Sequence, residues 1–401
     1  MISKMLSEIT SVITKGTTPT SVGCSFSKNG INYIKSESIT SSRTLDKSKY
    51  AFISEETHQK LKRSQIKEND ILFSMAGMFL GKTGIVQADD VPANTNQAVA
   101  IIRIVPEQAN YLYVYYYLNQ KNIVTWINSL SGQSAQPNIN LKQIGEIEIP
   151  LPDRIIQDTI VEMLSAIDSR IELNTAINEN LEQQAQAIFK AWFVDFEPFG
   201  GVMPDDWSEC ILDSMCSLII KGITPKYIEH SAQFVINQKC VRNHQIDLSL
   251  ARCHEPKKVN EKWLQYGDIV VNSTGTGTLG RAAQVLFTPN NMTVDSHVTI
   301  IRASKQEYIY YLGLWATSHE HDFEMLQTGS TGQTDLPRER LKQMQIVLPS
   351  DSILSSFSKV IKPIADIRIQ KQQENQRLSA LRDTLLPKLM NGEIDVSAVK
   401  I

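Results

Sequence analysis

Two glycine-rich segments have spacings that would suit nucleotide chemistry. Residues 275–280, Gly-Thr-Gly-Thr-Leu-Gly, satisfy the G-x-G-x-x-G pattern that cradles a dinucleotide pyrophosphate. That pattern requires a helix next, whereas residues 281–287, Arg-Ala-Ala-Gln-Val-Leu-Phe, are typical of a strand. Residues 77–83, Gly-Met-Phe-Leu-Gly-Lys-Thr, resemble a phosphate-binding loop with one residue too few between the glycines. We therefore expect two glycine hairpins and no nucleotide site.

Cysteine and histidine side chains raise the question of a metal site. Cys240, His244, Cys253 and His254 are all possible zinc ligands, but their spacing fits neither a zinc finger nor a zinc ribbon. The adjacent Cys253 and His254 cannot easily bind one ion together. Five cysteines without regular spacing also disfavour a disulfide framework. We predict no bound metal and no disulfide scaffold.

Motifs for covalent or hydrolytic catalysis are missing from the sequence. It contains no G-x-S-x-G, no H-E-x-x-H and no Asp/Asn-Pro-Pro-aromatic tetrapeptide of the amino-methyltransferase type. Asp247 with Glu255-Pro256-Lys257 is a faint match to a nuclease site, without a counterpart in the first half of the chain. We predict a non-catalytic protein. The alternative, a standalone nuclease, would require metal-dependent cleavage by the purified chain.

The elements that must position any binding residues occur twice. Ile-Thr-Lys-Gly-Thr-Thr-Pro at 13–19 returns as Ile-Ile-Lys-Gly-Ile-Thr-Pro at 219–225, and further matches follow in the same order. These further matches are 70–74 with 268–272, 80–82 with 279–281, 99–103 with 298–302, 132–133 with 332–333, 141–143 with 341–343 and 151–152 with 348–349. Such ordered self-similarity indicates an internal duplication.

Each copy has the same internal pattern. Short β-branched and aromatic runs alternate with Gly, Asn and Ser, and a stretch without these turn residues follows. The pattern predicts an α+β protein with two mixed α/β domains, at 1–152 and 197–350, and two long helical regions, at 153–196 and 351–401. Within the domains, the tyrosine-rich stretch 111–118 and the stretch 308–318 are expected to be helices.

Apolar residues recur every seven residues in both predicted long helices, as in coiled coils. The expected interface residues are Ile160, Ile167, Asn174, Leu181 and Ile188 in the first helix and Phe357, Ile364, Lys371, Leu378 and Leu385 in the second. We expect the two stripes to bury each other as an antiparallel coiled coil with Asn174 level with Lys371, which relates the two domains by a pseudo-twofold axis. The alternative is that each helix packs on its own domain.

Composition and charge limit the possible partners. The chain has 401 residues, 42% of them hydrophobic and 21% charged, with a formal net charge of −3, as in ordinary globular proteins. Because no large basic excess is present, DNA binding would be shared with basic partners. No apolar run approaches the ~18 residues of a membrane span, and residues 1–8 lack the pattern of an export signal. We expect a cytoplasmic protein that does not contact a membrane.

Several segments closely match one family. They are Ile-Pro-Leu-Pro at 149–152, Ala-Ile-Asp-Ser-Arg-Ile at 166–171, Ala-Ile-Phe-Lys-Ala-Trp-Phe-Val-Asp-Phe at 187–196, Pro-Asp-Asp-Trp at 204–207 and Leu-Arg-Asp-Thr-Leu-Leu-Pro-Lys-Leu-Met-Asn-Gly-Glu-Ile at 381–394. With them the chain resembles the specificity subunit of type I restriction-modification enzymes over essentially its whole length. Its first copy departs from the family pattern by lacking the Pro-Trp lead.

The resemblance implies two target recognition domains joined by two conserved helical regions. Each domain would read one half of a bipartite target in double-stranded DNA, and the helical pair would set the unread spacer. Two modification subunits would dock on the chain and methylate an adenine in each half with S-adenosylmethionine. Restriction subunits would add translocation and cleavage driven by ATP and Mg²⁺. The chain itself would bind no cofactor.

Base edges in the major groove are read by Asn, Gln, Arg, Lys, Ser and Thr side chains on loops. Such residues occupy matching predicted turns in both copies. The candidates in the first half are Lys15, Thr17, Thr18, Lys35, Ser36, Ser74, Lys82, Thr83, Gln133, Ser134, Gln136, Asn138 and Asn140. The candidates in the second half are Lys221, Thr224, Lys226, Asn237, Gln238, Lys239, Asn272, Ser273, Thr274, Thr276, Arg281, Gln333, Thr334 and Arg338.

Two alternatives apply to these residues. Polar loops are common on any surface, and residues shared by both copies, such as Lys15 with Lys221 and Gln133 with Gln333, suit structural or phosphate contacts better than base reading. For the whole chain, the competing hypothesis is a structural protein whose coiled coil drives self-assembly. A sequence-dependent gel shift with a modification subunit present would distinguish DNA reading from assembly.

Overall fold

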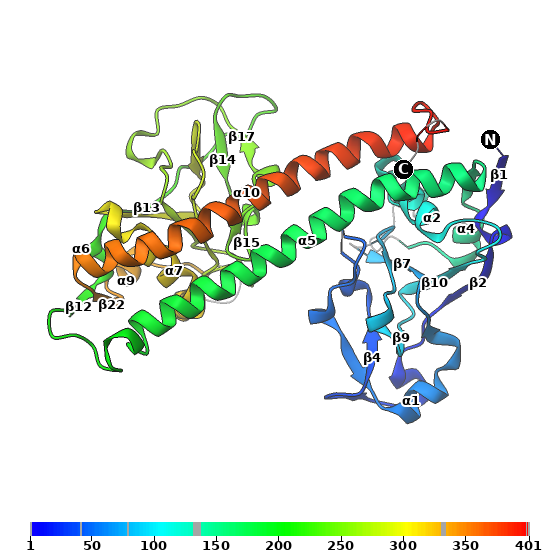
Figure 1. The fold of residues 1–401 in the computed structure, drawn as a ribbon, viewed down its shortest axis with the longest axis horizontal. Coiled ribbons are helices and arrows are strands. Elements are labelled where there is room, and N and C mark those ends of the chain that lie inside the picture. The colour runs from blue at the N-terminus through cyan, green and yellow to red at the C-terminus, as the bar shows by residue number, and fades with distance from the viewer. Residues whose placement is uncertain are drawn as a thin grey trace. The chain divides into compact units, whose positions relative to one another are not determined.

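The computed structural model describes residues 2–40, 42–77, 80–130, 138–329, 334–397 and 399. The chain forms two compact units, of which the first contains Met1–Glu172 and Gln376–Ile401 and the second contains Leu173–Asn375. Each unit combines a mixed α/β domain with parts of two long helices, α5 (Arg154–Phe193) and α10 (Asp351–Met390) (Figure 1). The predicted α+β class with two long helices is therefore confirmed.

The first unit is built on a four-stranded antiparallel sheet, whose order is β2-β10-β7-β8. A five-stranded sheet, β3-β5-β4-β9-β6, and a two-stranded ladder, β1-β11, complete it. The strands are β1 (Ile2–Met5), β2 (Thr10–Lys15), β3 (Phe26–Ser27), β4 (Ile31–Ile34), β5 (Ala51–Ile53), β6 (Gln65–Ile66), β7 (Ile71–Ser74), β8 (Thr83–Ile85), β9 (Ala93–Thr95), β10 (Val99–Ile104) and β11 (Glu148–Leu151). The helices are α1 (Glu55–Lys60), α2 (Tyr111–Leu118), α3 (Lys121–Leu130) and α4 (Leu141–Gly145).

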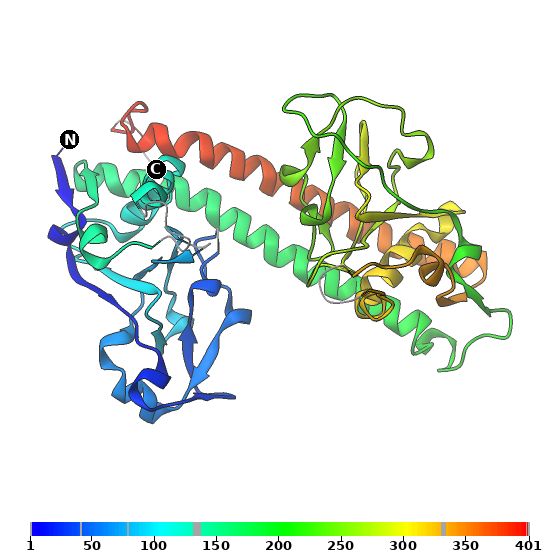
Figure 2. The ribbon, with the colours of Figure 1, turned by 180° about the vertical axis from the view of Figure 1, so that it is seen from behind.

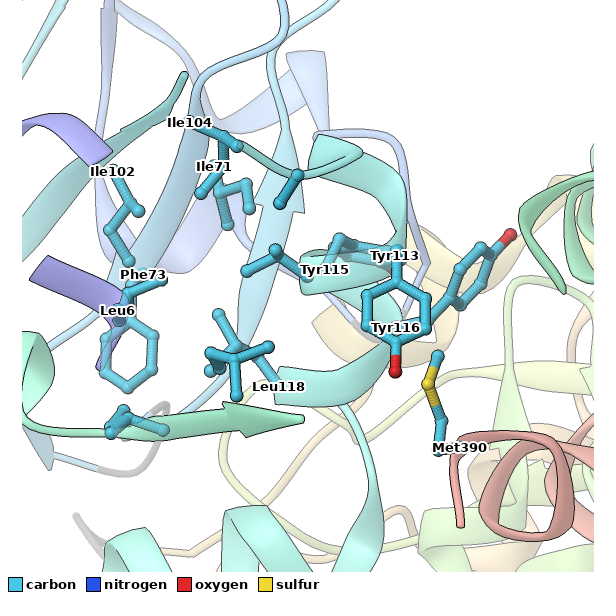
Figure 3. Packing of buried hydrophobic residues seen from close by; sticks show 14 of the residues in the cluster. Leu6, Ile71, Phe73, Ile102, Ile104, Tyr113, Tyr115, Tyr116, Leu118 and Met390 are labelled. Atoms are coloured by element: carbon cyan, nitrogen blue, oxygen red, sulfur yellow. The ribbon is translucent and has the colours of Figure 1, made fainter. Parts of the chain in front are cut away.

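The core of the first unit lies between the four-stranded sheet and the helices. Tyr113, Tyr116 and Leu118 of α2 pack with Phe73 of β7, and Met390 of α10 closes the same cluster (Figure 3). Burying these large aromatic side chains removes extensive apolar surface from water and supplies most of the driving force for folding. The tyrosine-rich stretch is thus a helix, as predicted, and its rings lie in the core.

The second unit repeats the four-stranded sheet and the two-stranded ladder, and differs in its other strands. Its four-stranded sheet has the order β13-β21-β18-β19, beside a ladder β12-β22, a three-stranded sheet β17-β14-β20 and a hairpin β15-β16. The strands are β12 (Ser208–Ile211), β13 (Cys216–Lys221), β14 (Phe234–Ile236), β15 (Val241–Arg242), β16 (Gln245–Ile246), β17 (Arg252–Cys253), β18 (Ile269–Asn272), β19 (Ala282–Gln284), β20 (Met292–Val294), β21 (Val298–Ala303) and β22 (Gln345–Leu348). The helices are α6 (Leu212–Met215), α7 (Ile309–Ser318), α8 (Glu320–Met325) and α9 (Arg338–Lys342).

A buried ion pair occurs at the same place in both units. In the first, Arg103 donates from Nε and Nη2 to the Asp70 carboxylate, each at 2.7 Å. In the second, Arg302 donates to Asp268 with the same geometry and the same distances. Both carboxylates are fully buried. Because this arrangement joins strands β7 and β10 in one unit and β18 and β21 in the other, it supports the duplication inferred from the sequence.

The two long helices are antiparallel partners within each unit. The C-terminal part of α10 runs beside the N-terminal part of α5 in the first unit, where Arg382 donates to Asp168 at 2.8 Å (Figure 2). In the second unit Arg368 donates to Glu182 at 2.7 Å. Both helices also contribute to the domain cores. The two long helices therefore pack against each other, as predicted, and also against the domains, as in the alternative.

The register predicted for the helix pair is wrong. Asn174 donates to Asn375 at 2.9 Å, so it lies level with Asn375 and not with Lys371, which pairs with Glu374 on its own helix at 3.1 Å. Of the predicted interface residues, Ile160, Asn174 and Phe357 are buried. The partly buried ones are Ile167, Leu181, Ile188, Ile364, Lys371, Leu378 and Leu385. The register is set by polar pairs that an apolar heptad count does not detect.

A histidine connects the second domain to the long helices. The His244 ring lies between two carboxylates, hydrogen-bonded to Glu182 on α5 and 3.5 Å from Glu320 on α8. Glu182 also accepts from Arg368 on α10, and Glu320 accepts from the Ala282 amide at 2.7 Å. Burial lowers the pKa of the His244 ring, but the hydrogen bonds of His244 to Glu182 and Glu320 have a larger effect and raise the pKa to about 9.

We expect this contact to make the second unit less stable at alkaline pH. Because the pKa rises from 6.5 to about 9, the stabilisation is complete below pH 6.5 and is lost as the pH rises through about 9. Urea unfolding of the wild type and His244→Gln should therefore differ most below pH 6.5 and converge above pH 9. A difference between the two proteins that does not change with pH would contradict the charged state of His244.

Candidate nucleic-acid interface

The loops that carry most of the predicted DNA-reading residues meet at one end of each four-stranded sheet. In the first unit, Lys15 pairs with Ala100, Val99 pairs with Ser74, and Phe73 pairs with Thr83. The end of β2, the β7–β8 hairpin and the loop before β10 are therefore neighbours. The second unit repeats this arrangement, since Lys221 pairs with Thr299 and Asn272 with Val298. We call this region the loop end of each unit.

A glycine at each loop end allows two loops to touch. The Gly16 amide bonds to Val99 O, and a Cβ built on Gly16 would lie 2.0 Å from Thr95 O. A Cβ on Gly222, the equivalent residue, would lie 2.1 Å from Val294 O. No side chain fits at such distances. The shared Lys-Gly pair in the sequence therefore marks a close backbone approach.

Replacing Gly16 by Ala should separate these loops and destabilise the first unit. The clash is with backbone, so relief requires loop movement, for which we expect about 1 to 3 kcal/mol of lost stability. Gly145→Ala in the same unit is the matched control, because its built Cβ approaches no closer than 3.4 Å to the Ser7 side chain. Thermal unfolding would compare the two variants. Equal melting temperatures would show that the loops tolerate the methyl group.

Eight of the described candidates in the first unit lie at or near the surface of the loop end. Lys15, Asn138 and Asn140 are exposed. The half-buried candidates are Thr17, Thr18, Lys35, Ser36 and Lys82. The segment at 138–140 joins the β7 loop, because the Ile139 amide bonds to Met75 O at 3.0 Å. Candidates from distant parts of the sequence thus form one polar surface.

The second unit assembles its candidates in the same way. The exposed ones are Thr224, Lys226, Lys239, Thr276 and Arg338, and the half-buried ones are Lys221, Asn237, Gln238, Thr274, Arg281 and Thr334. The Leu336 amide bonds to Ser273 O at 2.8 Å and brings the 334–338 segment to the loop end. Lys221 lies 2.5 Å from Asp335, so its charge is partly neutralised within the unit.

Four candidates do not belong to this surface, and their prediction as base readers is wrong. Ser74, Thr83, Asn272 and Ser273 have at most 1% of their surface exposed. Asn272 donates to Gln238 O at 3.1 Å, Ser273 Oγ lies 2.6 Å from Thr299 Oγ1, and Thr83 accepts from Asn119. Ser74, Thr83 and Asn272 are terminal residues of strands, and Ser273 directly follows a strand. At these positions the side chains still point into the protein.

Two other candidates act as helix caps. Asn140 Oδ1 accepts from the Gln143 amide at 2.9 Å at the start of α4. Asn237 Oδ1 accepts from the Lys239 amide at 2.9 Å, and its Nδ2 donates to Leu250 O at 3.1 Å. Their amides stabilise local structure in the way expected of N-cap residues. The candidates Gln133, Ser134, Gln136 and Gln333 lie outside the described residues.

Sequence reasoning missed two polar residues of the loop end. Gln97 is exposed and hydrogen-bonds to Thr18, and His297 is exposed with its Nδ1 3.0 Å from Thr274 Oγ1. Both come just before the matched strands at 99–103 and 298–302. Their position in an aligned loop was the signal that could have identified them.

The possible metal ligands Cys240, His244, Cys253 and His254 can be compared with the structure. None of their His, Cys, Asp and Glu side chains form a group of three that could hold a metal ion. Burial raises the pKa of Cys240 to about 11, which keeps this thiol protonated and a poor ligand. Within the same residues, none of the helices is long and apolar enough to cross a membrane.

The chain thus carries two similar domains, each with a polar loop end. Residues 3–183 match the family described as "Type I restriction modification DNA specificity domain". This match lies in the first part of the chain, and the relatives below are specificity subunits of type I restriction enzymes to which the chain is similar.

The relatives cover most of the chain. The type I restriction enzyme MjaIX specificity subunit of Methanocaldococcus jannaschii is 27% identical over 341 residues, which are 78% of this chain and 76% of the relative. The HindI specificity subunit of Haemophilus influenzae is 24% identical over 66% of this chain and 72% of its own length. The crystal structure of an S subunit from M. genitalium shares the fold, with a TM-score of 0.58, 16% identity and coverage of 97% of this chain and 95% of that one.

Proposed function

We propose that this non-catalytic subunit selects the DNA sequence on which a type I restriction-modification complex acts. Each domain reads one half of a bipartite target with its loop end. The observation that carries the proposal is the duplicated loop end, which has one backbone framework and different polar side chains in the two units. A duplicated framework with divergent side chains suits a protein that reads two different half-sites.

The proposed base- or phosphate-contacting residues are the candidates that reach the surface and do not cap a helix. In the first unit they are Lys15, Thr17, Thr18, Lys35, Ser36, Lys82 and Asn138, with Gln97 added. In the second they are Lys221, Thr224, Lys226, Gln238, Lys239, Thr274, Thr276, Arg281, Thr334 and Arg338, with His297 added. The recognition domains are proposed to comprise 1–152 and 197–350, and the conserved helical regions 153–196 and 351–401.

The proposal includes the partners that supply the chemistry. Two modification subunits with S-adenosylmethionine would dock on the chain, and restriction subunits with ATP and Mg²⁺ would join them. The net charge of −3 supports shared DNA binding, because the chain lacks the basic excess needed to neutralise many phosphates alone. The helix pair is proposed to set the spacer, and the complex to work in the cytoplasm.

Exchanging reading residues tests this function. The chain would be co-expressed with the modification subunit of the same system, and adenine methylation of the host genome would be mapped by sequencing. Replacing Thr17, Thr18 and Gln97 together by Ala should alter the methylated sequence in one half of the target only. Replacing Thr274, Thr276 and His297 should alter the other half. A change in both halves from either triple variant, or no sequence preference in the wild type, would contradict modular reading.

A further inference from the structure

An exposed arginine in the second unit lies over an aromatic ring. Arg252, in β17, places its guanidinium carbon 3.6 Å from the centroid of the Tyr227 ring. The two residues come from neighbouring segments, because Tyr227 forms a β-bridge with His254. A guanidinium stacked on a ring is attracted by the π-electrons and loses much of its rotational freedom.

The ring beneath this arginine is itself fixed. The Tyr227 ring packs against the buried cluster of Ile223, Val235 and Val259, and burial together with the nearby Asp295 carboxylate raises the pKa of its hydroxyl. Asp295 Oδ1 accepts from the His297 amide at 2.9 Å. Asp295 is 5% exposed and pairs with Ile223 through a β-bridge. Asp295 and Ile223 belong to the loop end, so the stacked pair is anchored directly to the proposed reading surface.

Among the residues that the structure describes, none accepts a hydrogen bond from the Arg252 guanidinium. Within the described part of the chain, the stack on Tyr227 is the interaction recorded for this side chain, and the residue is exposed. The nearby lysines are engaged, since Lys257 donates to Thr224 O at 2.8 Å and Lys262 donates to Gly222 O at 2.9 Å. Arg252 therefore presents its N–H donors at the exposed surface, held over the Tyr227 ring.

We propose that Arg252 reads a guanine in the half-site of the second domain, an inference that rests on the proposed function. A planar arginine fork matches the O6 and N7 acceptors of guanine in the major groove. A phosphate contact would require positive charge but no fixed plane, which a mobile lysine supplies equally well. The stack on Tyr227 fixes the plane in advance, so less conformational freedom is lost on binding.

The first unit has a different side chain at the same place. Arg252 pairs with Val235 in β14, and the equivalent pair in the first unit is Ala51 with Tyr33. The residue equivalent to Tyr227 is Phe26, over whose ring Lys35 lies at 5.5 Å. The framework is thus shared while the cation differs, as is expected of residues that distinguish two half-sites.

The test uses the full chain in complex with its modification subunit. Genomic adenine methylation is mapped for the wild type and for Arg252→Ala, Arg252→Lys and Tyr227→Ala. Arg242→Ala is the matched control, because Arg242 is an exposed arginine of the same domain in the β15–β16 hairpin. Thermal unfolding of each complex shows whether the variants remain folded.

We expect a G·C pair in the half-site of the second domain whose selection depends on Arg252. Arg252→Ala and Arg252→Lys should each lower the preference for that pair by about 10- to 100-fold, because an ammonium group cannot replace the bidentate fork. Tyr227→Ala should weaken the same position, and Arg242→Ala should leave the sequence unchanged. The other half-site should be read normally in every variant.

Two results would overturn the inference alone. One is an unchanged methylated sequence in Arg252→Ala. The other is weaker methylation at every site while the recognised sequence stays unchanged, which would indicate that Arg252 contacts a phosphate. A wild-type complex without sequence preference would overturn the proposed function, and this inference with it.

Discussion

Replacing Arg302 by Met is expected to destabilise the second unit by about 3 to 5 kcal/mol, as when one partner of a buried ion pair is removed. Asp268 is fully buried and accepts from Arg302 at 2.7 Å and from the Gln265 amide at 2.7 Å. Without the Arg302 guanidinium, the Asp268 carboxylate keeps the Gln265 amide as a donor but loses the positive charge that compensates its own. Chemical unfolding followed by circular dichroism would measure the loss.

The duplication supplies the comparison for this prediction. Arg103→Met removes the same interaction from Asp70 and should destabilise the first unit by a similar amount. Arg338→Met is the surface control, because its ion pair with Glu339 is 3.0 Å long but largely exposed. Exposed pairs contribute about 0 to 1 kcal/mol. If Arg302→Met and Arg338→Met unfolded alike, the buried pair would not be a main support of the fold.

The arrangement of elements could be predicted because it depends on features that are local in the sequence. Ordered matches between the two halves identified the duplication, and the absence of turn residues identified α5 and α10. The segment 281–287 was predicted to continue as a strand, and β19 (Ala282–Gln284) confirms this. Each of these features can be recognised from residues that are close together in the sequence, either because the segment occurs twice or because turn residues are present or missing.

The register of the helix pair could not be predicted in the same way. The buried stripe of α5 is shared between α10 and the domains, and it contains Asn174 and the ion-paired Asp168. An apolar heptad count treats such residues as surface positions. It therefore selected Lys371 as the partner of Asn174, whereas the hydrogen bond between Asn174 and Asn375 determines the register of α5 against α10.

For the proposed reading surface, the sequence indicated which loops lie together but not which of their side chains are exposed. Ser74 and Lys82 both flank the β7–β8 hairpin, yet Ser74 is fully buried and Lys82 is half-buried. Which residue at a strand end points outward depends on the strand register. The stack of Arg252 on Tyr227 was also invisible, because the two residues are far apart in sequence and join only through strand pairing.

Lengthening both long helices by seven residues is expected to change the spacer that the complex recognises. The insertions belong after Glu172 in α5 and after Asn375 in α10, where each helix passes from one unit into the other. Contacts within each unit, including Asp168 with Arg382 and Asn174 with Asn375, are then retained. Seven helical residues add about 10 Å along the helix, which corresponds to about three base pairs at 3.4 Å each.

The methylated sequence of this double insertion should keep both half-sites and separate them by about three more base pairs. A heptad turns the helix by only about 20°, whereas three base pairs turn the DNA by about 100°. We therefore expect slower methylation as well as a longer spacer. Insertion into α5 alone is the control, because it shifts Asp168 away from Arg382 and should destabilise the chain. If the double insertion kept the original spacer, the helix pair would not be the ruler.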